Sequence, residues 1–209
     1  MEVVRLIKSF LTRIKSQKIH EVVYLVYFHI FLGLYDIVHS TRFRHTRSAK
    51  EMAHNNDMTG SFPIHPSHAR RLLRASSMSL ETRLLDVGCG TGMALYVASR
   101  SGMKHLHGIE MGDAPYEDAK HNLKNRAIVM KGDALSVDLN QYDALFFFNS
   151  FRGETADRFF ANVPQSIRCI ITVNCDPRLF ALLSNQGYRV YYSKRSVMYK
   201  NFSSIIWKR

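Results

Sequence analysis

Three acidic residues follow short apolar runs at regular intervals in the middle of the chain. Asp86 lies in LLDVG, Glu110 ends HGIE, and Asp133 follows IVMKG. If each run is a parallel strand, the three carboxylates meet at one edge of a sheet, because the carboxyl ends of parallel strands share that edge. Carboxylates gathered in one pocket disfavour a bound phosphate and favour a cationic or hydroxyl-bearing ligand. The spacing therefore predicts a small-molecule site of this kind.

A glycine loop follows the first of these acids. Gly88, Gly90 and Gly92 occupy every second position; glycine admits positive φ and lets a ligand approach the backbone. A tight strand-to-helix turn explains one such glycine and explains three poorly. A dinucleotide site would place its third glycine at position 93, which is Met93. The loop is therefore predicted to hold a cationic ligand rather than a pyrophosphate.

The elements that must position these residues alternate between strand and helix from Thr82 onward. The chain closes with two β-branched and aromatic runs joined by a polar turn, which predicts a hairpin. This pattern predicts an α/β fold with a doubly wound, mostly parallel, seven-stranded Rossmann-like sheet and a C-terminal antiparallel hairpin. Strands are expected at 83–87, 105–111, 127–131, 144–149, 169–174, 188–192 and 197–207, and helices at 92–101, 116–125, 154–163 and 176–186.

The N-terminal third differs from the rest of the chain. We predict a basic helical extension and cap segment over 1–75 and the α/β domain over 76–209. Residues 1–22 place apolar side chains at helical spacing with Lys and Arg between them, typical of a basic amphipathic helix. Such a helix packs on the domain or lies in a membrane interface. A polar linker over 40–58 precedes a short helix that starts within 63–74, with Pro66 in its first turn and Ser67 near its N-cap.

The apolar run Val22–Tyr35 is only 14 residues long. A helix that spans a bilayer needs about 20 apolar residues, and His29 and Gly33 interrupt the run. We therefore expect it not to span. No A-x-A-like cleavage site follows the run, so no signal peptide is predicted. The three cysteines show no metal-like spacing and favour reduced thiols in a cytoplasmic compartment.

Together, the order Asp-x-Gly-x-Gly-x-Gly and the acids at three successive strand ends resemble the class I S-adenosylmethionine-dependent methyltransferases. The resemblance implies that the loop 88–92 holds the amino-acid portion of S-adenosyl-L-methionine. It also implies that Glu110 binds the ribose hydroxyls and that Asp133, with the amide of Ala134, binds the adenine edge. The cofactor-binding residues that it implies are Asp86, Gly88, Cys89, Gly90, Thr91, Gly92, Glu110, Met111, Asp133 and Ala134.

The predicted fourth strand ends with Asn149-Ser150-Phe151. The chain is similar here to small, mostly bacterial methyltransferases that carry Asn-Pro-Phe after this strand and a segment like 56–68 upstream. Ser150 departs from their proline and loosens a turn that proline would fix, so the acceptor does not carry over. Asn149 is a candidate for orienting the acceptor or fixing the cofactor through its backbone; the alternative is a residue that only ends the strand.

Other polar and aromatic residues leave alternatives open. His65 and His68 are candidates for a general base, and solvated loop histidines are the other interpretation. Their HxxH spacing lacks a third ligand, so no metal site is expected. Tyr116 either covers the adenine or packs on the sheet. The row Phe146–Phe148 is interpreted as a buried strand rather than an aromatic cage.

Charge bears on the acceptor. The net charge of +12 is concentrated in residues 1–75, which hold 12 Lys and Arg against 5 Asp and Glu. We predict a methyltransferase with a small-molecule or glycan-intermediate acceptor, located in the cytoplasm with peripheral contact to anionic membrane through residues 1–20. The alternatives are an RNA or protein-lysine methyltransferase, or an inactive module that binds a membrane or a partner on the same fold. Nucleic acid is less favoured because the chain lacks interleaved basic and aromatic residues.

Overall fold

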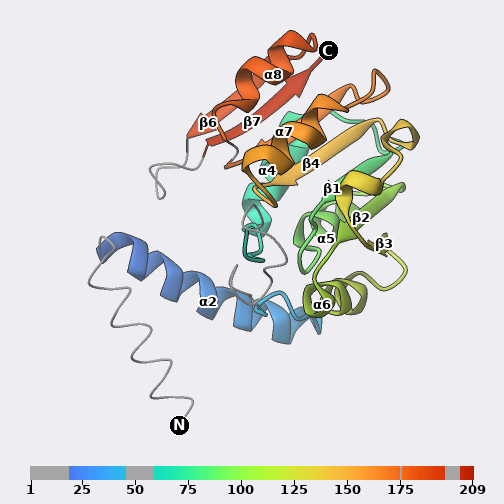
Figure 1. Cartoon of the computed structure of the whole chain (residues 1–209). Helices are drawn as coiled ribbons and strands as arrows, with labels where there is room; N and C mark the ends of the chain where they lie inside the picture. Colours follow the sequence, from blue (N-terminus) through green and yellow to red (C-terminus); the bar gives the residue numbers. More distant parts are fainter. Residues whose placement is uncertain (1–18, 46–58, 175, 196–202) are drawn as a thin grey trace.

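A seven-stranded sheet organises the molecule (Figure 1). The computed structural model describes residues 19–45, 59–174, 176–195 and 203–209. The strand order is β3-β2-β1-β4-β5-β7-β6; the first five strands of the chain are parallel, and β7 is antiparallel to both β5 and β6. The predicted fold class is confirmed. The strands are β1 Leu84–Val87, β2 Leu106–Glu110, β3 Ile128–Lys131, β4 Ala144–Phe148, β5 Cys169–Val173, β6 Arg189–Arg195 and β7 Ser203–Lys208.

Helices cover both faces of the sheet, so the central strands are apolar on both sides. Successive residues alternate between two cores: Leu84 and Phe146 belong to one, Leu85 and Phe147 to the other. Helices α4, α5 and α6 contribute to the first core, and α7 and α8 to the second. The described helices are α2 Ile19–His39, α4 Pro66–Ala75, α5 Met93–Arg100, α6 Asp113–Leu123, α7 Gly153–Ala161 and α8 Leu179–Asn185, with 3-10 turns η1 Ala134–Ser136 and η2 Leu139–Gln141.

The strand order reverses between β1 and β4. β1 is paired with β2 on one side and with β4 on the other, and all three run in the same direction. The loops that follow β1 and β4 therefore leave the same edge toward opposite faces, and the crevice between them is where open α/β sheets bind ligands.

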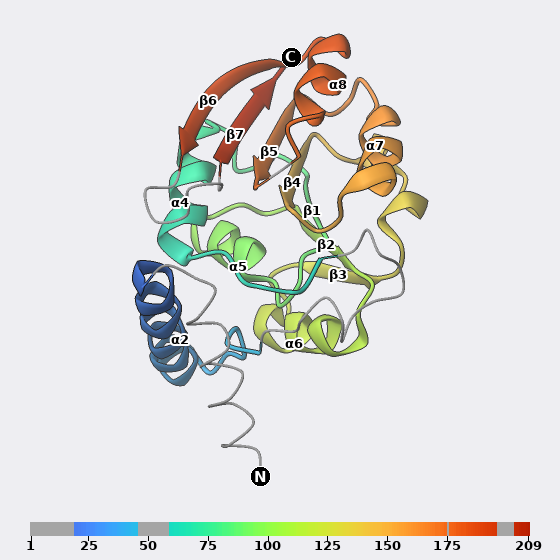
Figure 2. The same ribbon diagram turned by 60° about the vertical axis from the view of Figure 1, so that its left-hand side comes forward.

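The last strand of the chain is inserted between two earlier strands of the sheet. The last described strand, β7, lies between β5 and β6 rather than at the edge (Figure 2). It carries Trp207, which is fully buried and donates from Nε1 to Thr172 Oγ1 of β5 at 3.0 Å. The predicted hairpin is present, but its second strand begins at Ser203, and residues 196–202 lie outside the described part.

Helix α2 contains the apolar run Val22–Tyr35 and packs on the domain through one face. Phe28 and Leu32 are fully buried, and Tyr35 of α2 contacts the ring of Tyr96 in α5. Among the described residues, no helix is long and apolar enough to cross a membrane. The predicted basic helix over 1–22 falls mostly outside the described residues.

Helix α4 begins at Pro66, so Pro66 lies in its first turn and Ser67 lies near its N-cap, as predicted. His65, not Ser67, is the N-cap: its Nδ1 accepts from the amide of Ser67 at 3.2 Å, and Pro66 opens the first turn. Proline suits this position because its missing N–H would have no partner there. The cap itself is His65, whose imidazole takes the role that a serine hydroxyl commonly fills.

Candidate active site

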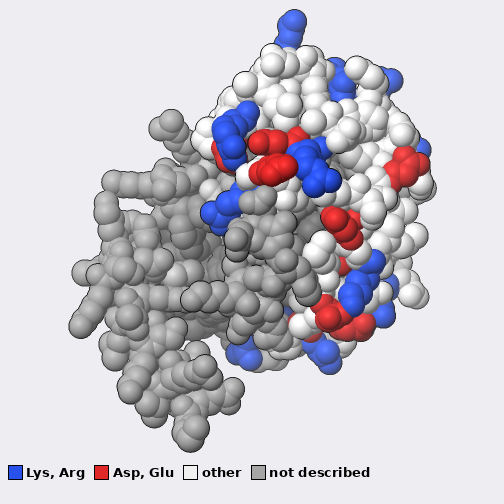
Figure 3. All heavy atoms as spheres, viewed as in Figure 1, with Lys and Arg blue, Asp and Glu red and all other residues white. Residues whose placement is uncertain are grey.

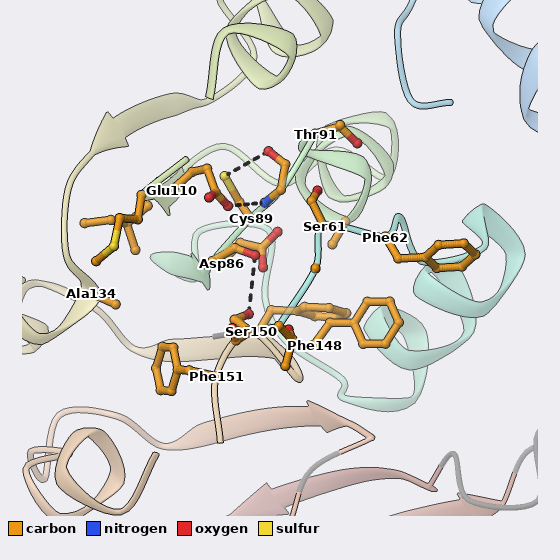
Figure 4. Close-up of a pocket in the computed structure, with 18 of the residues that line it drawn as sticks. Ser61, Phe62, Asp86, Cys89, Thr91, Glu110, Ala134, Phe148, Ser150 and Phe151 are labelled. Atoms are coloured by element: carbon orange, nitrogen blue, oxygen red, sulfur yellow. Dashed lines mark hydrogen bonds between the residues drawn. The ribbon is translucent and has the colours of Figure 1, made fainter. Parts of the chain in front are cut away.

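A cavity of about 320 Å³ opens at the carboxyl ends of β1, β2 and β4 (Figure 4). It contains nine of the ten residues predicted to bind a cofactor. Among the described lining residues, Gly92, Asn149 and His65 do not appear. The predicted residues that line the cavity are Asp86, Gly88, Cys89, Gly90, Thr91, Glu110, Met111, Asp133 and Ala134.

The glycine loop needs glycine for two separate reasons. Gly88, Gly90 and Gly92 have φ values of 67°, 55° and 84°, in the left-handed region that L side chains disfavour. Neighbours also leave no room for a Cβ. At Gly88 it would lie 2.6 Å from Ser150 Oγ, and at Gly92 it would lie 2.8 Å from Leu123 Cδ1. Gly92 therefore lets α6 pack against the loop rather than facing the cavity.

Two carboxylates share the cavity floor. Asp86 of β1 is buried, and burial followed by repulsion from Glu110 raises its pKa to about 8. No described residue donates a hydrogen bond to the Asp86 carboxylate. Burial also raises the pKa of Glu110 of β2, opposed by hydrogen bonds from backbone amides; its carboxylate accepts from Gly90 and Gly112, both at 2.8 Å. The floor is an acidic site that lacks a described countercharge.

Cys89 lies beside this pair and is unsuited to nucleophilic chemistry. It is buried, and burial together with the charges of Asp86 and Glu110 raises the pKa of its thiol well above the usual range. A thiol acts as a nucleophile only as thiolate. Cys89 packs closely on Gly108 of β2, where an added Cβ would lie 2.8 Å from the sulfur. Its part in the site is steric.

The end of β4 is joined to the glycine loop through Ser150. The Ser150 hydroxyl donates to the carbonyl of Val87 and approaches that of Gly88 at 3.3 Å (Figure 4). Asn149, which precedes it, has a φ of 45°, and its carbonyl accepts from the hydroxyl of Thr59. A hydrogen bond therefore replaces the ring that proline would supply, and Asn149 is held by its backbone at the end of the strand.

A buried amide supports the loop from the other side. Asn122 of α6 donates from Nδ2 to the carbonyl of Thr91 at 2.9 Å, and its Oδ1 accepts from the backbone amide of Arg42 at 2.6 Å. One turn earlier, Asp118 approaches His45 Nδ1 at 3.1 Å. Helix α6 thus connects the segment after α2 to the glycine loop. Sequence patterns gave no signal for Asn122, because a single asparagine in a helix has no distinctive spacing.

The two candidate bases have structural partners. His65 caps α4, and its ring stacks on Phe31 of α2 with centroids 4.8 Å apart. His68 Nε2 lies 2.8 Å from Ser204 Oγ of β7. Burial lowers the pKa of both imidazoles. Neither histidine is among the described residues that line the cavity. In the described part of the chain, no cluster of His, Cys, Asp and Glu could hold a metal ion.

The third predicted acid lies at the rim. Asp133 is exposed and caps η1 by accepting from the amide of Leu135 at 2.9 Å, while Ala134 is buried in the cavity wall. Tyr116 does not line the cavity, and its ring faces the Lys120 ammonium at 5.0 Å. Phe146 and Phe147 are buried in the sheet, as the strand interpretation predicted, whereas Phe148 is half-buried and lines the cavity.

Several lining residues were not among the predicted site residues. Ser61 and Phe62 come from the segment before α4, Phe151 follows β4, and Thr155 and Arg158 come from α7. Arg158 is the one Lys or Arg among the described lining residues. The helical spacing of Thr155 and Arg158 was visible, but only the tertiary structure shows that this face of α7 reaches the cavity.

Comparison with known proteins agrees with this geometry. A family model described as a methyltransferase domain matches residues 84–168. Residues 84–168 therefore match the family of methyltransferase domains. The matched segment contains the glycine loop, all three predicted acids and α7, so it supplies most of the residues that line the cavity.

Individual relatives of the methyltransferase domain differ in what their names say they modify. The chain is 29% identical over 99 residues to a ribosomal RNA small subunit methyltransferase A of Prochlorococcus marinus, covering 46% of this chain and 32% of that protein. It is 27% identical over 85 residues to a protein-lysine N-methyltransferase of Saccharolobus islandicus, covering 38% and 53%. The chain thus spans about a third to a half of the length of these curated relatives.

A solved structure shares the fold at lower identity. The magnesium protoporphyrin IX methyltransferase from Synechocystis PCC 6803 with bound SAM superposes with a TM-score of 0.56 at 16% identity, covering 68% of this chain and 76% of that one. This likeness concerns the fold alone, and the names of these three proteins give three different acceptors.

Proposed function

We propose that the chain transfers a methyl group from S-adenosyl-L-methionine to a small-molecule acceptor or a glycan intermediate. One observation carries the proposal: Asp86 and Glu110 are buried together over the glycine loop with no described cation to balance them. A positively charged ligand supplies the missing countercharge, whereas a phosphate would add to the repulsion.

The residues present fit this cofactor. The hydroxyl of Thr91 is buried in the cavity wall without a hydrogen-bond partner among the described residues, and a buried polar atom of this kind normally has one. We propose that Asp86 and the loop 88–92 bind the methionine portion and that Glu110 accepts from the ribose hydroxyls. Asp133 and the amide of Ala134 would bind the adenine edge, with Met111 beside the ring. Gly92 contributes through loop packing.

The protein's contribution to the reaction is alignment and exclusion of water. When bound, the cofactor supplies an electrophilic methyl group on a sulfonium. Methyl transfer is an in-line displacement in which the acceptor's lone pair forms the new bond while the sulfur keeps the electrons of the old one. The aromatic wall of Phe148 and Phe151 would orient the acceptor. Asn149 would position this wall through its backbone, and His65 is not proposed as a base because it caps α4 and stacks on Phe31.

The acceptor side favours a small ligand. Phe62, Phe148 and Phe151 give it apolar walls, and Arg158 adds one cation at the exposed rim. Such a surface suits a planar or anionic molecule of limited size. On the face seen in Figure 3, Lys and Arg alternate with Asp and Glu over the described surface rather than forming a basic field.

RNA or protein lysine is a second candidate acceptor. The net charge of +12 and the names of the two curated relatives favour it. Binding to generic RNA would then fall steeply with salt, because cations released from the phosphates drive such binding. If the affinity for RNA does not change as the salt concentration rises to a moderate value, the small-molecule acceptor is favoured.

The cofactor assignment is tested by calorimetry on the full chain with S-adenosylmethionine. We expect binding by the wild type and by Asp113→Asn, an exposed acid at the start of α6. We expect a loss of at least ~30-fold in affinity for Asp86→Asn, in line with about 2 kcal/mol for a charged pair. No heat with the wild type would instead favour an inactive module on the same fold.

The acceptor class needs a separate experiment. The chain is incubated with methyl-labelled S-adenosylmethionine and a cell extract, and the label is traced into small molecules, lipid-linked glycans, RNA and protein. We expect label in the first two fractions. Label confined to RNA or protein would replace the small-molecule acceptor with the second candidate.

Three further sequence-based proposals accompany this function. We propose that the chain divides into an extension over 1–75 and the catalytic domain over 76–209, and that it resembles the small methyltransferases with an Asn-Pro-Phe element. We also propose a cytoplasmic enzyme that contacts anionic membrane through residues 1–20, of which 1–18 lie outside the described residues. Deletion of 1–20 should reduce binding to anionic vesicles.

A further inference from the structure

Helix α2 has an apolar face that the described chain does not cover. In Figures 1 and 2 the helix lies at the periphery of the molecule, outside α5. Its outward residues recur at helical spacing and are between 39% and 78% exposed. We call them the outer stripe: Val23, Val26, Tyr27, Ile30, Leu34, Ile37 and Val38. A contiguous apolar surface of this kind marks an interaction site rather than scattered surface residues.

The opposite face of α2 is already packed on the domain. Phe28 and Leu32 are fully buried, Phe31 stacks on His65, and Phe28 contacts Phe62 with centroids 5.3 Å apart. The helix is therefore fixed in one orientation, and its outer stripe points away from the core. A helix that is apolar on both sides needs a second apolar environment in addition to its own core.

The chain after α2 folds back and brings a cation to the edge of this stripe. The carboxylate of Asp36 accepts from the amides of Phe43 and Arg44, both at 2.8 Å, and from Thr41 Oγ1 at 2.7 Å. This arrangement lays Arg44 along the helix, with Nη1 3.5 Å from where a Cβ on Gly33 would lie. Gly33 is three residues after Ile30, so it borders the outer stripe.

Basic residues flank α2 at both ends. The exposed Arg44 follows it, as does Arg42, whose Nη1 lies 3.9 Å from Asp118 Oδ1, and residues 1–18 hold five Lys and Arg against one acid. Two copies paired in parallel through the outer stripe would bring Arg44 of one copy close to Arg44 of the other. Like charges in contact disfavour that pairing. An anionic surface, in contrast, balances cations at both ends of an apolar helix.

We infer that the outer stripe of α2 docks on the surface of an anionic phospholipid bilayer. The helix lies in the plane of the interface, with the stripe at the level of the upper acyl chains and Arg44 at the phosphates. It does not cross the bilayer, because its other face is packed on the domain. Docking would also bring the cavity near the membrane. Phe62 lines the cavity and packs on the ring of Phe28, which lies on the face of α2 opposite the outer stripe. The inference does not depend on methyl transfer.

The first test measures sedimentation of the full chain with vesicles. We expect binding to vesicles of phosphatidylcholine mixed with phosphatidylglycerol and weak binding to phosphatidylcholine alone. Ile30→Glu should lower the affinity at least ~10-fold, because it places a charge in the apolar layer. Ile128→Glu is the matched control, since Ile30 and Ile128 are both 59% exposed and Ile128 lies on β3. Arg44→Gln should lower only the binding to anionic vesicles, by about five-fold.

Several outcomes would overturn the inference. They are a wild type that ignores vesicles, equal losses for Ile30→Glu and Ile128→Glu, and unchanged binding of Ile30→Glu. The last result would leave any membrane contact to residues 1–20 alone. Thermal unfolding of each variant, expected at the wild-type temperature, separates loss of docking from loss of fold.

A second measurement distinguishes lipid from other occupants of the stripe. Leu34→Trp adds an indole within the stripe, while the native Trp207 is fully buried and contributes a constant background. We expect a blue shift of the emission on addition of phosphatidylglycerol vesicles. Emission that is already blue-shifted in the free protein would show that the chain itself or a second copy covers the stripe. Dimers that Ile30→Glu converts to monomers would assign the stripe to a second copy.

Discussion

Ionisation of Asp86 has opposite effects on the stability of the ligand-free fold and on the affinity for a cationic ligand. A carboxylate that is buried beside Glu110 and lacks a described donor ionises only near pH 8. A cationic ligand stabilises the ionised form, so binding is expected to release a proton near neutral pH and to strengthen as the pH rises toward that value. Because Asp86 is buried, the free energy of unfolding of the ligand-free protein is expected to fall as the pH rises toward 8.

Asp86→Asn should reveal this cost. Between about pH 4 and pH 8 the unfolded wild type loses the proton of Asp86 while the folded state retains it, so stability falls as the pH rises through this window. The amide cannot ionise. Each pKa unit corresponds to ~1.4 kcal/mol, and a chain of this size shifts its Tm by about 2–4 °C per kcal/mol. Both proteins are compared without ligand. The Tm of Asp86→Asn relative to that of the wild type should therefore rise by at least ~5 °C between about pH 5 and about pH 8.5.

Circular dichroism melts at the two pH values provide the measurement. Asp113→Asn, which changes an exposed acid, should show a constant difference from wild type. If Asp86→Asn also shows a constant difference, the carboxylate of Asp86 is ionised in the folded state and the raised pKa is wrong.

Gly88 and Ser150 form a steric pair that one substitution can disrupt and a second can partly repair. Gly88→Ala introduces a left-handed alanine, at about 1–2 kcal/mol, and a clash with Ser150, at about 1–3 kcal/mol. Ser150→Gly removes the obstructing atoms but also the hydrogen bond to Val87. The double variant should therefore be more stable than the sum of the single effects by at least ~1 kcal/mol.

Urea unfolding of the four proteins gives this coupling energy. Gly187→Ala is the control for backbone strain alone, since Gly187 has a φ of 88° and nothing within 4 Å of an added Cβ. Additive effects of Gly88→Ala and Ser150→Gly would mean that the two residues do not meet.

At the scale of elements, helix α6 holds the glycine loop in place. Asn122→Asp keeps the acceptor for the amide of Arg42 and removes the donor to the carbonyl of Thr91. A buried carbonyl that loses its partner costs about 1–3 kcal/mol. We expect the affinity for S-adenosylmethionine to fall about ten-fold by calorimetry. Asn125→Asp makes the same chemical change at an exposed position and should leave affinity unchanged. Equal effects of the two variants would show that net charge, and not the Asn122 bond, is responsible.

The sequence predicted most elements because their patterns are local. Strand β1 and the glycine loop follow from apolar residues, an acid and the three glycines, and the cavity contains nearly every residue predicted from them. The insertion of β7 between β5 and β6 has no local signal, since alternation identifies a strand but not its neighbours. The roles of His65 as a cap and of Asn122 as a bridge were likewise hidden, because both depend on partners from other elements.

At the scale of the whole molecule, ligand binding should be visible as selective stabilisation. A ligand at about 100 times its Kd adds ~2.7 kcal/mol to the free energy of unfolding, or about 5–10 °C in Tm for a chain of this size. We expect this shift with S-adenosylmethionine and none with the same concentration of NADH, whose phosphates would meet Asp86 and Glu110. Stabilisation by NADH alone would contradict the cationic-ligand site.

The hydrogen bond from Ser150 to the end of β1 has a consequence for the order of events at the crevice. A single hydroxyl joins the loop beneath the proposed methyl donor to the loop beside the acceptor walls. Movement of either loop should alter the other, so we expect binding of the proposed donor and binding of the proposed acceptor to be energetically coupled. Reciprocity then requires that the factor by which a bound donor changes acceptor affinity equals the factor by which a bound acceptor changes donor affinity. Ser150→Ala, which keeps the Cβ and removes the hydroxyl, should bring that factor toward one.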